Sequence, residues 1–338
     1  MRNMFLYKPK MLSSFVIILV LNIISSAFAS NIPNAQELIE QFGIKQQELV
    51  YLDHGKIIFF DLKESTESEL TTGAAMYMPS EPSKVADLIK REDLESLDEA
   101  VNAAGVIPLN ATLDTFKDFG FRAESVEAED FLSATPGFRF NLSKQEFQTL
   151  RTINTTQANV ASEVYREFLW QRWQSYRKNG LQGISPYDRG NGEQTNPSRQ
   201  LQMASLESKF LAYYFPKIFN VWQNYPVNLP VGVQEAFFWN NREVQGYSTA
   251  ILVHRITFSE SAGELILARQ FYVGRSFNAN QLIIICLPYH KGSLVFYLNR
   301  TFTDQITGFG SSLKQLIGNN QAQTEVTKLL KNLRSSIK

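Results

Sequence analysis

Five short apolar segments follow one another in the last third of the sequence, and they constrain the fold more than any other feature. Each segment has the length and the content of β-branched and aromatic residues that are typical of a strand. Turn residues such as Gly246, Gly263 and Gly292 separate them at hairpin spacing, so we expect neighbouring segments to pair antiparallel. The segments are residues 234–239, 248–258, 264–274, 281–287 and 293–299.

The middle of this predicted sheet is apolar on both faces. In segment 248–258, alternation places Leu252 and Ile256 on one face and Ile251 and Val253 on the other. A sheet with one solvated face alternates cleanly between apolar and polar residues along each strand. We therefore expect the middle strands to be covered on both sides.

Helical segments on either side of these strands in the sequence can supply that cover. Residues 157–178 and 198–218 carry apolar residues at spacings of three and four, which indicates amphipathic helices. The C-terminal segments 303–316 and 322–337 carry an apolar stripe formed by Leu313, Leu316, Val326, Leu329, Leu330 and Leu333. We expect the C-terminal helix on one face of the sheet and the 157–218 helices on the other.

The first half of the chain mixes shorter elements. We predict a helix at 34–42, a turn at 51–55, strands at 56–62 and 70–78, a helix at 83–91, a mixed region at 92–150 and a polar loop at 181–197. No internal repeat, low-complexity tract or hinge-like linker separates these elements. The sequence therefore predicts one α+β domain over residues 30–338, with a large helical insertion at about 92–229.

Residues 1–29 have the three parts of a cleavable signal peptide. Three basic residues precede an apolar run at 15–24, which is about half the length that a membrane span needs. Ala27 and Ala29 then supply the small residues of a cleavage site, so Ser30 is the expected first residue of the mature chain. The protein is therefore expected in the periplasm of a bacterial envelope or as a secreted protein.

Charge and cysteine content narrow the class of protein further. The chain has 33 basic and 33 acidic residues, and residues 1–29 hold three of the basic ones and none of the acidic ones. The mature chain is thus slightly acidic, whereas a nucleic-acid-binding protein shows a basic excess. Cys286 is the only cysteine and lies in an apolar run, so we expect a buried, inert thiol. The lack of disulfides favours a bacterial setting.

Motifs for metal or nucleotide chemistry are absent from the sequence. It contains no HExxH, no G-x-S-x-G, no P-loop and no G-x-G-x-x-G segment. Its three histidines, His54, His254 and His290, are far apart in the sequence. We therefore expect neither a metal nor a cofactor, and no nucleic-acid partner.

The order of elements resembles the helix-grip architecture of START and polyketide-cyclase domains. Residues 79–91 resemble that superfamily's proline-initiated helix, and residues 235–301 are similar to a group of uncharacterised exported bacterial proteins. The residues that carry the second similarity are Phe238-Trp239, His254, Arg269-Gln270, Tyr272 and Tyr297-Leu298-Asn299-Arg300. The resemblance covers about residues 50–91 and 230–338. It implies a curved antiparallel sheet around a long C-terminal helix, with an apolar cavity between them that holds a lipid.

Five polar residues of the predicted strands are candidates for ligand binding: His254, Arg269, Tyr272, Tyr297 and Arg300. Strict alternation puts Arg269 and Tyr272 on opposite faces of one strand, so at most one of them joins His254. Tyr297 and Arg300 likewise lie on opposite faces. Because His254 is the only histidine within a strand, we expect it nearest the cavity. The alternative is a core histidine bonded to a neighbouring strand or a buried tyrosine.

These observations favour an exported, non-enzymatic protein that binds an apolar or amphipathic ligand such as a lipid. One alternative is a structural or interaction protein whose side chains fill the cavity. The other is a cyclase- or hydrolase-like enzyme that uses His254. Segment 170–176 is typical either of peripheral membrane contact or of core packing. Residues 187–189 are typical of a pocket mouth or of a solvated turn.

The signal peptide predicts the start of the mature chain. Protein recovered from the cell envelope should begin at or near Ser30, because Ala27 and Ala29 present the cleavage site. N-terminal sequencing measures this directly. Protein that retains Met1 and stays in the cytosol would contradict it.

Overall fold

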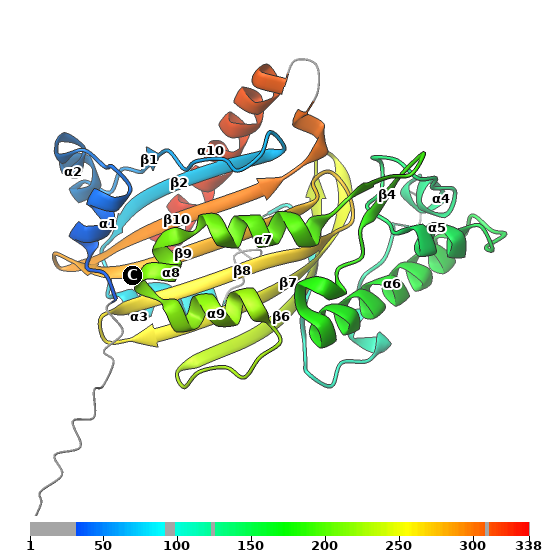
Figure 1. Ribbon diagram of the computed structural model, residues 1–338, viewed down its shortest axis with the longest axis horizontal. Coiled ribbons are helices and arrows are strands. Elements are labelled where there is room, and N and C mark those ends of the chain that lie inside the picture. Colours follow the sequence, from blue (N-terminus) through cyan, green and yellow to red (C-terminus); the bar gives the residue numbers. More distant parts are fainter. Residues whose placement is uncertain (1–31, 92–98, 123–125, 308–310, 338) are drawn as a thin grey trace, which may run out of the picture. The chain divides into compact units, whose positions relative to one another are not determined.

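The five predicted strands form the centre of an eight-stranded sheet in which every pair is antiparallel. The computed structural model describes residues 32–91, 99–122, 126–307 and 311–337 (Figure 1). The strand order is β1-β2-β10-β9-β8-β7-β6-β3. The strands are β1 (Ile58–Phe60), β2 (Glu69–Met78), β3 (Val101–Ile107), β6 (Val233–Val244), β7 (Tyr247–Glu260), β8 (Gly263–Val273), β9 (Ala279–Tyr289) and β10 (Gly292–Phe302).

The predicted meander is confirmed as β6 to β10, and four of these five strands, all except β8, are longer than the sequence indicated. Tight turns join them. Between β6 and β7, Gln245 and Gly246 have φ angles of 54° and 80°. Positive φ at both central residues is the geometry of a two-residue hairpin turn whose twist matches that of its strands. β3 was not predicted, since residues 101–107 were assigned to a mixed region; it pairs with β6 at the edge of the sheet.

The two faces of the sheet are both apolar and both covered, as predicted. We call the face that carries Leu252, Leu267 and Phe296 the front face; it contacts α1 (Ala35–Gln41), α2 (Gln46–Asp53) and the helices of the 92–229 insertion. The opposite face, which carries Ile266 and Ile284, contacts α3 (Pro82–Arg91) and α10 (Ser311–Ser336), and we call it the α10 face. Figure 1 shows α7 and α9 in front of the sheet and α10 behind it.

A bulge in β8 changes which side chains share a face. Leu252 pairs with Tyr272 and Val253 pairs with Gln270, so Phe271 has no partner in β7. The extra residue shifts the alternation by one position. Phe271 and Tyr272 therefore both lie on the front face, together with Arg269. The prediction that Arg269 and Tyr272 lie on opposite faces is wrong for this reason.

The insertion holds more elements than the sequence indicated. Its helices are α4 (Glu127–Leu132), α5 (Lys144–Leu150), α6 (Ala158–Asn179), α7 (Pro197–Glu207), α8 (Lys209–Tyr214) and α9 (Pro216–Asn224). The single helix predicted at 198–218 is three helices, since Ser208 ends α7 and Pro216 can begin a helix but not continue one. The predicted polar loop contains a hairpin, β4 (Tyr187–Gly190) and β5 (Glu193–Thr195).

Other segments also differ from the prediction. The turn predicted at 51–55 is mostly the end of α2. The two predicted C-terminal helices are one helix, α10. On this helix Val326, Leu330 and Leu333 are buried against the sheet, while Leu329 is half-buried. The side chains of Leu313 and Leu316 lie outside the described part.

Aromatic packing fixes the insertion to the sheet. Trp173 and Tyr176 on α6 are buried, so this part of the 170–176 segment is a packing surface. Tyr176 stacks on Phe271 with ring centroids 3.9 Å apart. Nearby, Arg172 of α6 donates to Glu146 of α5 over 2.7 Å. Removing one partner of such a buried ion pair costs about 3–5 kcal/mol, so this pair holds α5 and α6 together.

The predicted signal peptide, residues 1–29, lies outside the described residues. Within the part of the chain that the structure describes, none of the helices combines the length and the apolar character needed to cross a membrane.

Candidate functional site

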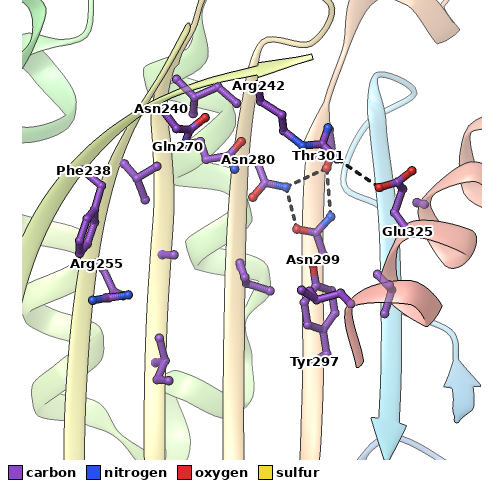
Figure 2. A pocket seen from close by; sticks show the side chains of 18 of the residues that line it. Phe238, Asn240, Arg242, Arg255, Gln270, Asn280, Tyr297, Asn299, Thr301 and Glu325 are labelled. Carbon is purple, nitrogen blue, oxygen red and sulfur yellow. Dashed lines mark hydrogen bonds and ion pairs between the residues drawn. The ribbon is translucent and has the colours of Figure 1, made fainter. Parts of the chain in front are cut away.

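A cavity of about 280 Å³ lies between the α10 face of the sheet and α10 itself (Figure 2). Strands β6 to β10 form its floor, and α10 and the end of α3 form its opposite wall. Its apolar lining includes Phe238, Val253, Ile266, Leu282, Val326 and Leu329. The cavity is at the small end of the range of ligand pockets, which is about 300–1,000 Å³.

One end of the cavity is lined by amides and a hydroxyl rather than by apolar groups. Gln270, Asn280 and Thr301 are neighbours across β8, β9 and β10. The Asn280 Nδ2 atom donates to Asn299 Oδ1 over 2.7 Å and to Thr301 Oγ1 over 2.8 Å. Asn299 Nδ2 in turn donates to Thr301 Oγ1 over 3.0 Å. These neutral polar groups lie beside the Arg242–Glu325 ion pair, and together with the apolar floor they give the cavity an amphipathic lining.

Asn240 of β6 is the most unusual residue of the lining. Its side chain is 1% exposed, yet neither Nδ2 nor Oδ1 has a hydrogen-bond partner among the described residues. The Oε1 atom of Gln270 is also buried without a partner. A buried polar group left unpaired costs about 1–3 kcal/mol, and native proteins leave few of them. The cavity therefore holds hydrogen-bonding capacity that the described chain does not use.

The charged side chains of the lining already have protein partners. Arg242 lies 3.1 Å from Glu325 of α10. Arg255 lies over the Phe238 ring at 4.3 Å and donates to the carbonyl of Lys90 over 3.0 Å. These contacts leave the apolar and amide surfaces as the part of the lining that is open to a ligand.

Of the five predicted site residues, the structure places only Tyr297 in this cavity. Burial raises the pKa of Tyr297 well above its ordinary value, so its hydroxyl stays protonated. The other four, His254, Arg269, Tyr272 and Arg300, lie on the front face. The expectation that His254 lies nearest the cavity is therefore wrong, because its alternation along β7 points it to the opposite side of the sheet.

His254 sits in a buried cluster under α6 and α9. Its Nδ1 atom is 2.9 Å from the hydroxyl of Tyr176, and its Nε2 atom is 3.4 Å from Glu235 Oε2. Arg269 donates to the same Tyr176 hydroxyl over 3.1 Å and to the Trp222 carbonyl over 2.9 Å. His254 and Arg269 are thus brought together through Tyr176, as a core histidine with protein partners.

The electrostatics of this cluster keep His254 neutral. Burial, with a further contribution from Arg269, lowers the pKa of His254 to about 4, although Glu235 opposes this shift. Burial raises the pKa of Glu235, but His254 and Arg177 outweigh it and the net shift is downward. The arrangement is a neutral imidazole beside a carboxylate, enclosed by protein.

Tyr272 and Arg300 are also held by protein groups. The Tyr272 hydroxyl is 2.9 Å from that of Tyr165. Arg300 of β10 donates to Glu69 of β2 over 2.7 Å and to the Lys63 carbonyl over 3.0 Å. Both residues therefore lie on the face of the sheet opposite to Tyr297.

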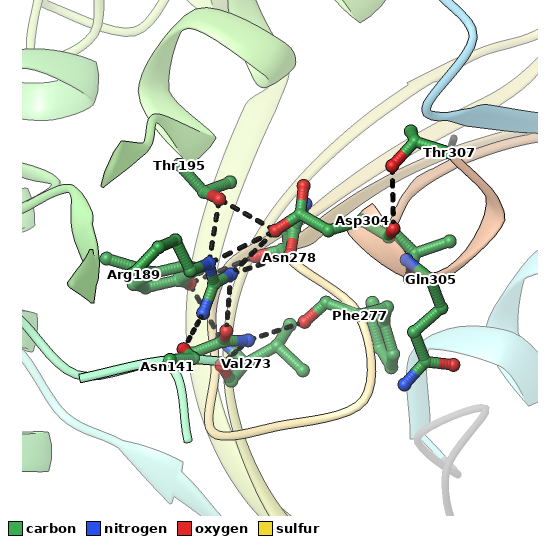
Figure 3. Close-up of polar contacts among 12 residues, drawn as sticks. Asn141, Arg189, Thr195, Val273, Phe277, Asn278, Asp304, Gln305 and Thr307 are labelled. Carbon is green, nitrogen blue, oxygen red and sulfur yellow. Dashed lines mark hydrogen bonds and ion pairs between the residues drawn. The ribbon is translucent and has the colours of Figure 1, made fainter. Parts of the chain in front are cut away.

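A third polar cluster surrounds Arg189 of β4 (Figure 3). Its guanidinium donates to Thr195 over 2.8 Å and to Asn141 over 2.9 Å, and it lies 2.9 Å from Asp304. Asn278 in turn donates to Asp304 over 3.0 Å. Both interpretations of residues 187–189 are therefore wrong: Tyr187 and Arg189 are buried and attach the β4–β5 hairpin to the end of the sheet.

Comparison with protein-family models, curated proteins and solved structures finds no match to this chain.

The amide residues Asn240 and Asn280 were not predicted as site residues. Asn240 directly follows the apolar run at 236–239 and Asn280 precedes the run that begins at 282, so both fell outside the predicted strands 234–239 and 281–287. Gln270 and Asn299 appeared only as part of the resemblance to exported proteins. His254 was predicted instead because it is titratable, although a titratable residue in a strand occurs in a protein core as readily as in a ligand site.

The lowered pKa of His254 predicts a dependence of stability on pH. Unfolding returns the imidazole to its ordinary pKa of 6.5, so the unfolded chain takes up a proton between pH 6.5 and about 4 that the folded chain does not. This group's contribution is therefore complete above pH 6.5 and falls on acidification by about 1.4 kcal/mol per pH unit. Urea unfolding at a series of pH values measures it.

His254→Gln should remove this part of the slope, whatever its effect on stability at neutral pH. The matched control is His290→Gln, at an exposed histidine, which should keep the slope of the unchanged protein. The contribution of Glu235 falls below its ordinary pKa of 4.5 and does not overlap most of this range. A His254→Gln variant with an unchanged slope would show that the pKa of His254 is not lowered by folding.

Proposed function

We propose that this chain is an exported binding protein that holds an apolar or amphipathic ligand, such as a lipid, in the cavity between the sheet and α10. The observation that carries the proposal is the cavity of about 280 Å³, with its apolar floor and a buried amide that has no partner. Such a combination is the usual composition of a ligand pocket: mostly apolar walls with a few convergent polar groups.

We further propose that the sheet and α10 form a helix-grip arrangement of the START type. Three observations support this: the sheet is antiparallel throughout, the C-terminal helix lies along one of its faces, and the cavity lies between them. The front-face helices then belong to the insertion and to the N-terminal elements. Export is part of the same proposal and is supported by the signal-peptide pattern of residues 1–29.

The two alternatives have less support. An interaction protein with a filled core would place its own side chains in the space under α10, where a cavity lies. An enzyme would use His254, Glu235 and Tyr176, which do converge. However, none of the three lines the cavity, and both His254 and Tyr176 are fully buried.

The physical basis of binding is the removal of apolar surface from water, at about 25 cal/mol per Å². Because the cavity is small, its occupant is a single chain or a comparably small molecule. A fixed sheet floor and a helical wall hold the apolar part without a large rearrangement of the protein.

Filling the cavity tests the proposal. Ala268 of β8 lines the cavity and is half-buried. Ala268→Phe should occupy the space and weaken binding of the neutral apolar dye N-phenyl-1-naphthylamine about tenfold or more, which is about 1.4 kcal/mol. Dye fluorescence measures the affinity.

Ala236→Phe is the matched control, since Ala236 lies on the same face of the sheet but does not line the cavity. This variant should bind the dye as the unchanged protein does. Thermal unfolding of both variants checks that each is folded. Equal dye binding by the Ala268→Phe variant and the unchanged protein would contradict the proposal.

A further inference from the structure

We propose that the ligand carries a neutral polar head group with both a hydrogen-bond donor and an acceptor, such as a hydroxyl or a carboxamide, which Asn240 binds. The inference rests on the proposed function and names the class of ligand for the same cavity. It follows from the unpartnered groups of the lining, from the partners of its charged residues and from its size.

Asn240 offers both halves of a hydrogen-bonding pair. Its Nδ2 is a donor and its Oδ1 an acceptor, and both are buried without a partner. Its neighbours in the adjacent strands, Ala104 and Ile251, have apolar side chains and cannot form hydrogen bonds with the amide. A ligand that satisfies both atoms must itself donate and accept.

The other acceptor of the lining points to the same chemistry. Gln270 Oε1 is buried without a partner and requires a donor. Asn280, Asn299 and Thr301 already bond to one another. An ionised carboxylate or phosphate only accepts hydrogen bonds, so it would place negative oxygens beside two carbonyl oxygens that need donors. A hydroxyl can donate to one of these oxygens, and a primary carboxamide, which has two N–H groups, can donate to both.

The cations around the cavity do not favour an anion. Arg242 is paired with Glu325, and Lys328 is 2.9 Å from Glu99. Arg255 donates to the Lys90 carbonyl and lies over the Phe238 ring. Transferring an ionised head group into this site would require it to lose its hydration without gaining a cation of its own. From the small volume of the cavity we also infer that the apolar part of the ligand is a single hydrocarbon chain.

Competition against the dye compares head groups on one chain length. At about pH 8, where decanoate is ionised, 1-decanol should displace N-phenyl-1-naphthylamine from the unchanged protein at a concentration about tenfold lower than decanoate. Asn240→Leu should weaken 1-decanol binding about tenfold and leave dye affinity unchanged. It should also raise the thermal midpoint of the ligand-free protein, because it removes an amide that has no partner.

Asn241→Leu is the matched control. Asn241 is the next residue of β6, pairs with Ala250 and faces the opposite side of the sheet. This substitution should leave 1-decanol binding unchanged. Displacement by decanoate as readily as by 1-decanol, or unchanged 1-decanol affinity in the Asn240→Leu variant, would overturn the inference while leaving the proposed function intact. Failure of the unchanged protein to bind the dye would overturn both.

Discussion

The whole structure depends on a sheet that is apolar on both faces. Strands β7 to β10 carry aliphatic and aromatic side chains in both directions, so each face must be covered to remove them from water. The front face receives α1, α2 and the insertion helices. Among the described elements, the α10 face receives only α3 and α10. Two helices do not cover the whole of this face, and the cavity lies between the sheet and α10 where helix side chains do not fill the space.

The buried polar groups of the chain differ in whether they are enclosed by protein or line the cavity. The clusters around His254 and Arg189 bind elements together, and their hydrogen bonds and ion pairs are made within the protein. Atoms without a partner occur in the His254 cluster too, at His254 Nε2 and Arg269 Nε, but those residues are fully enclosed by protein, whereas Asn240 and Gln270 line the cavity. Unused hydrogen-bonding capacity beside an apolar hollow, rather than a titratable residue, is what marks the candidate site.

Much of the fold could be predicted from the sequence, since it depends on periodicity. The meander, the helix at α6 and the cover on both faces follow from alternation and from spacings of three and four. Local events were harder to predict. The bulge at Phe271 has no sequence signature, yet it moves Tyr272 to the front face. β3 is a short edge strand, and Tyr187 and Arg189 are buried only because distant residues meet them.

The site was predicted less well, for a related reason. Alternation shows which residues share a face, but it does not show which face has the cavity. His254 and Asn240 lie on opposite faces of adjacent strands, and both are buried polar residues. The positions of α6 and α9 place Tyr176 against His254, and the position of α10 leaves a cavity that Asn240 lines. Alternation along the strands does not contain this information.

The central claim is that the cavity under α10 holds a ligand. A crystal structure of the protein, purified without detergent from the cells that make it, tests it most directly. The account predicts one elongated stretch of electron density between the sheet and α10, ending within hydrogen-bonding distance of the Asn240 amide. A cavity that contains only ordered water, with water molecules bonded to Asn240 and Gln270, would contradict the account.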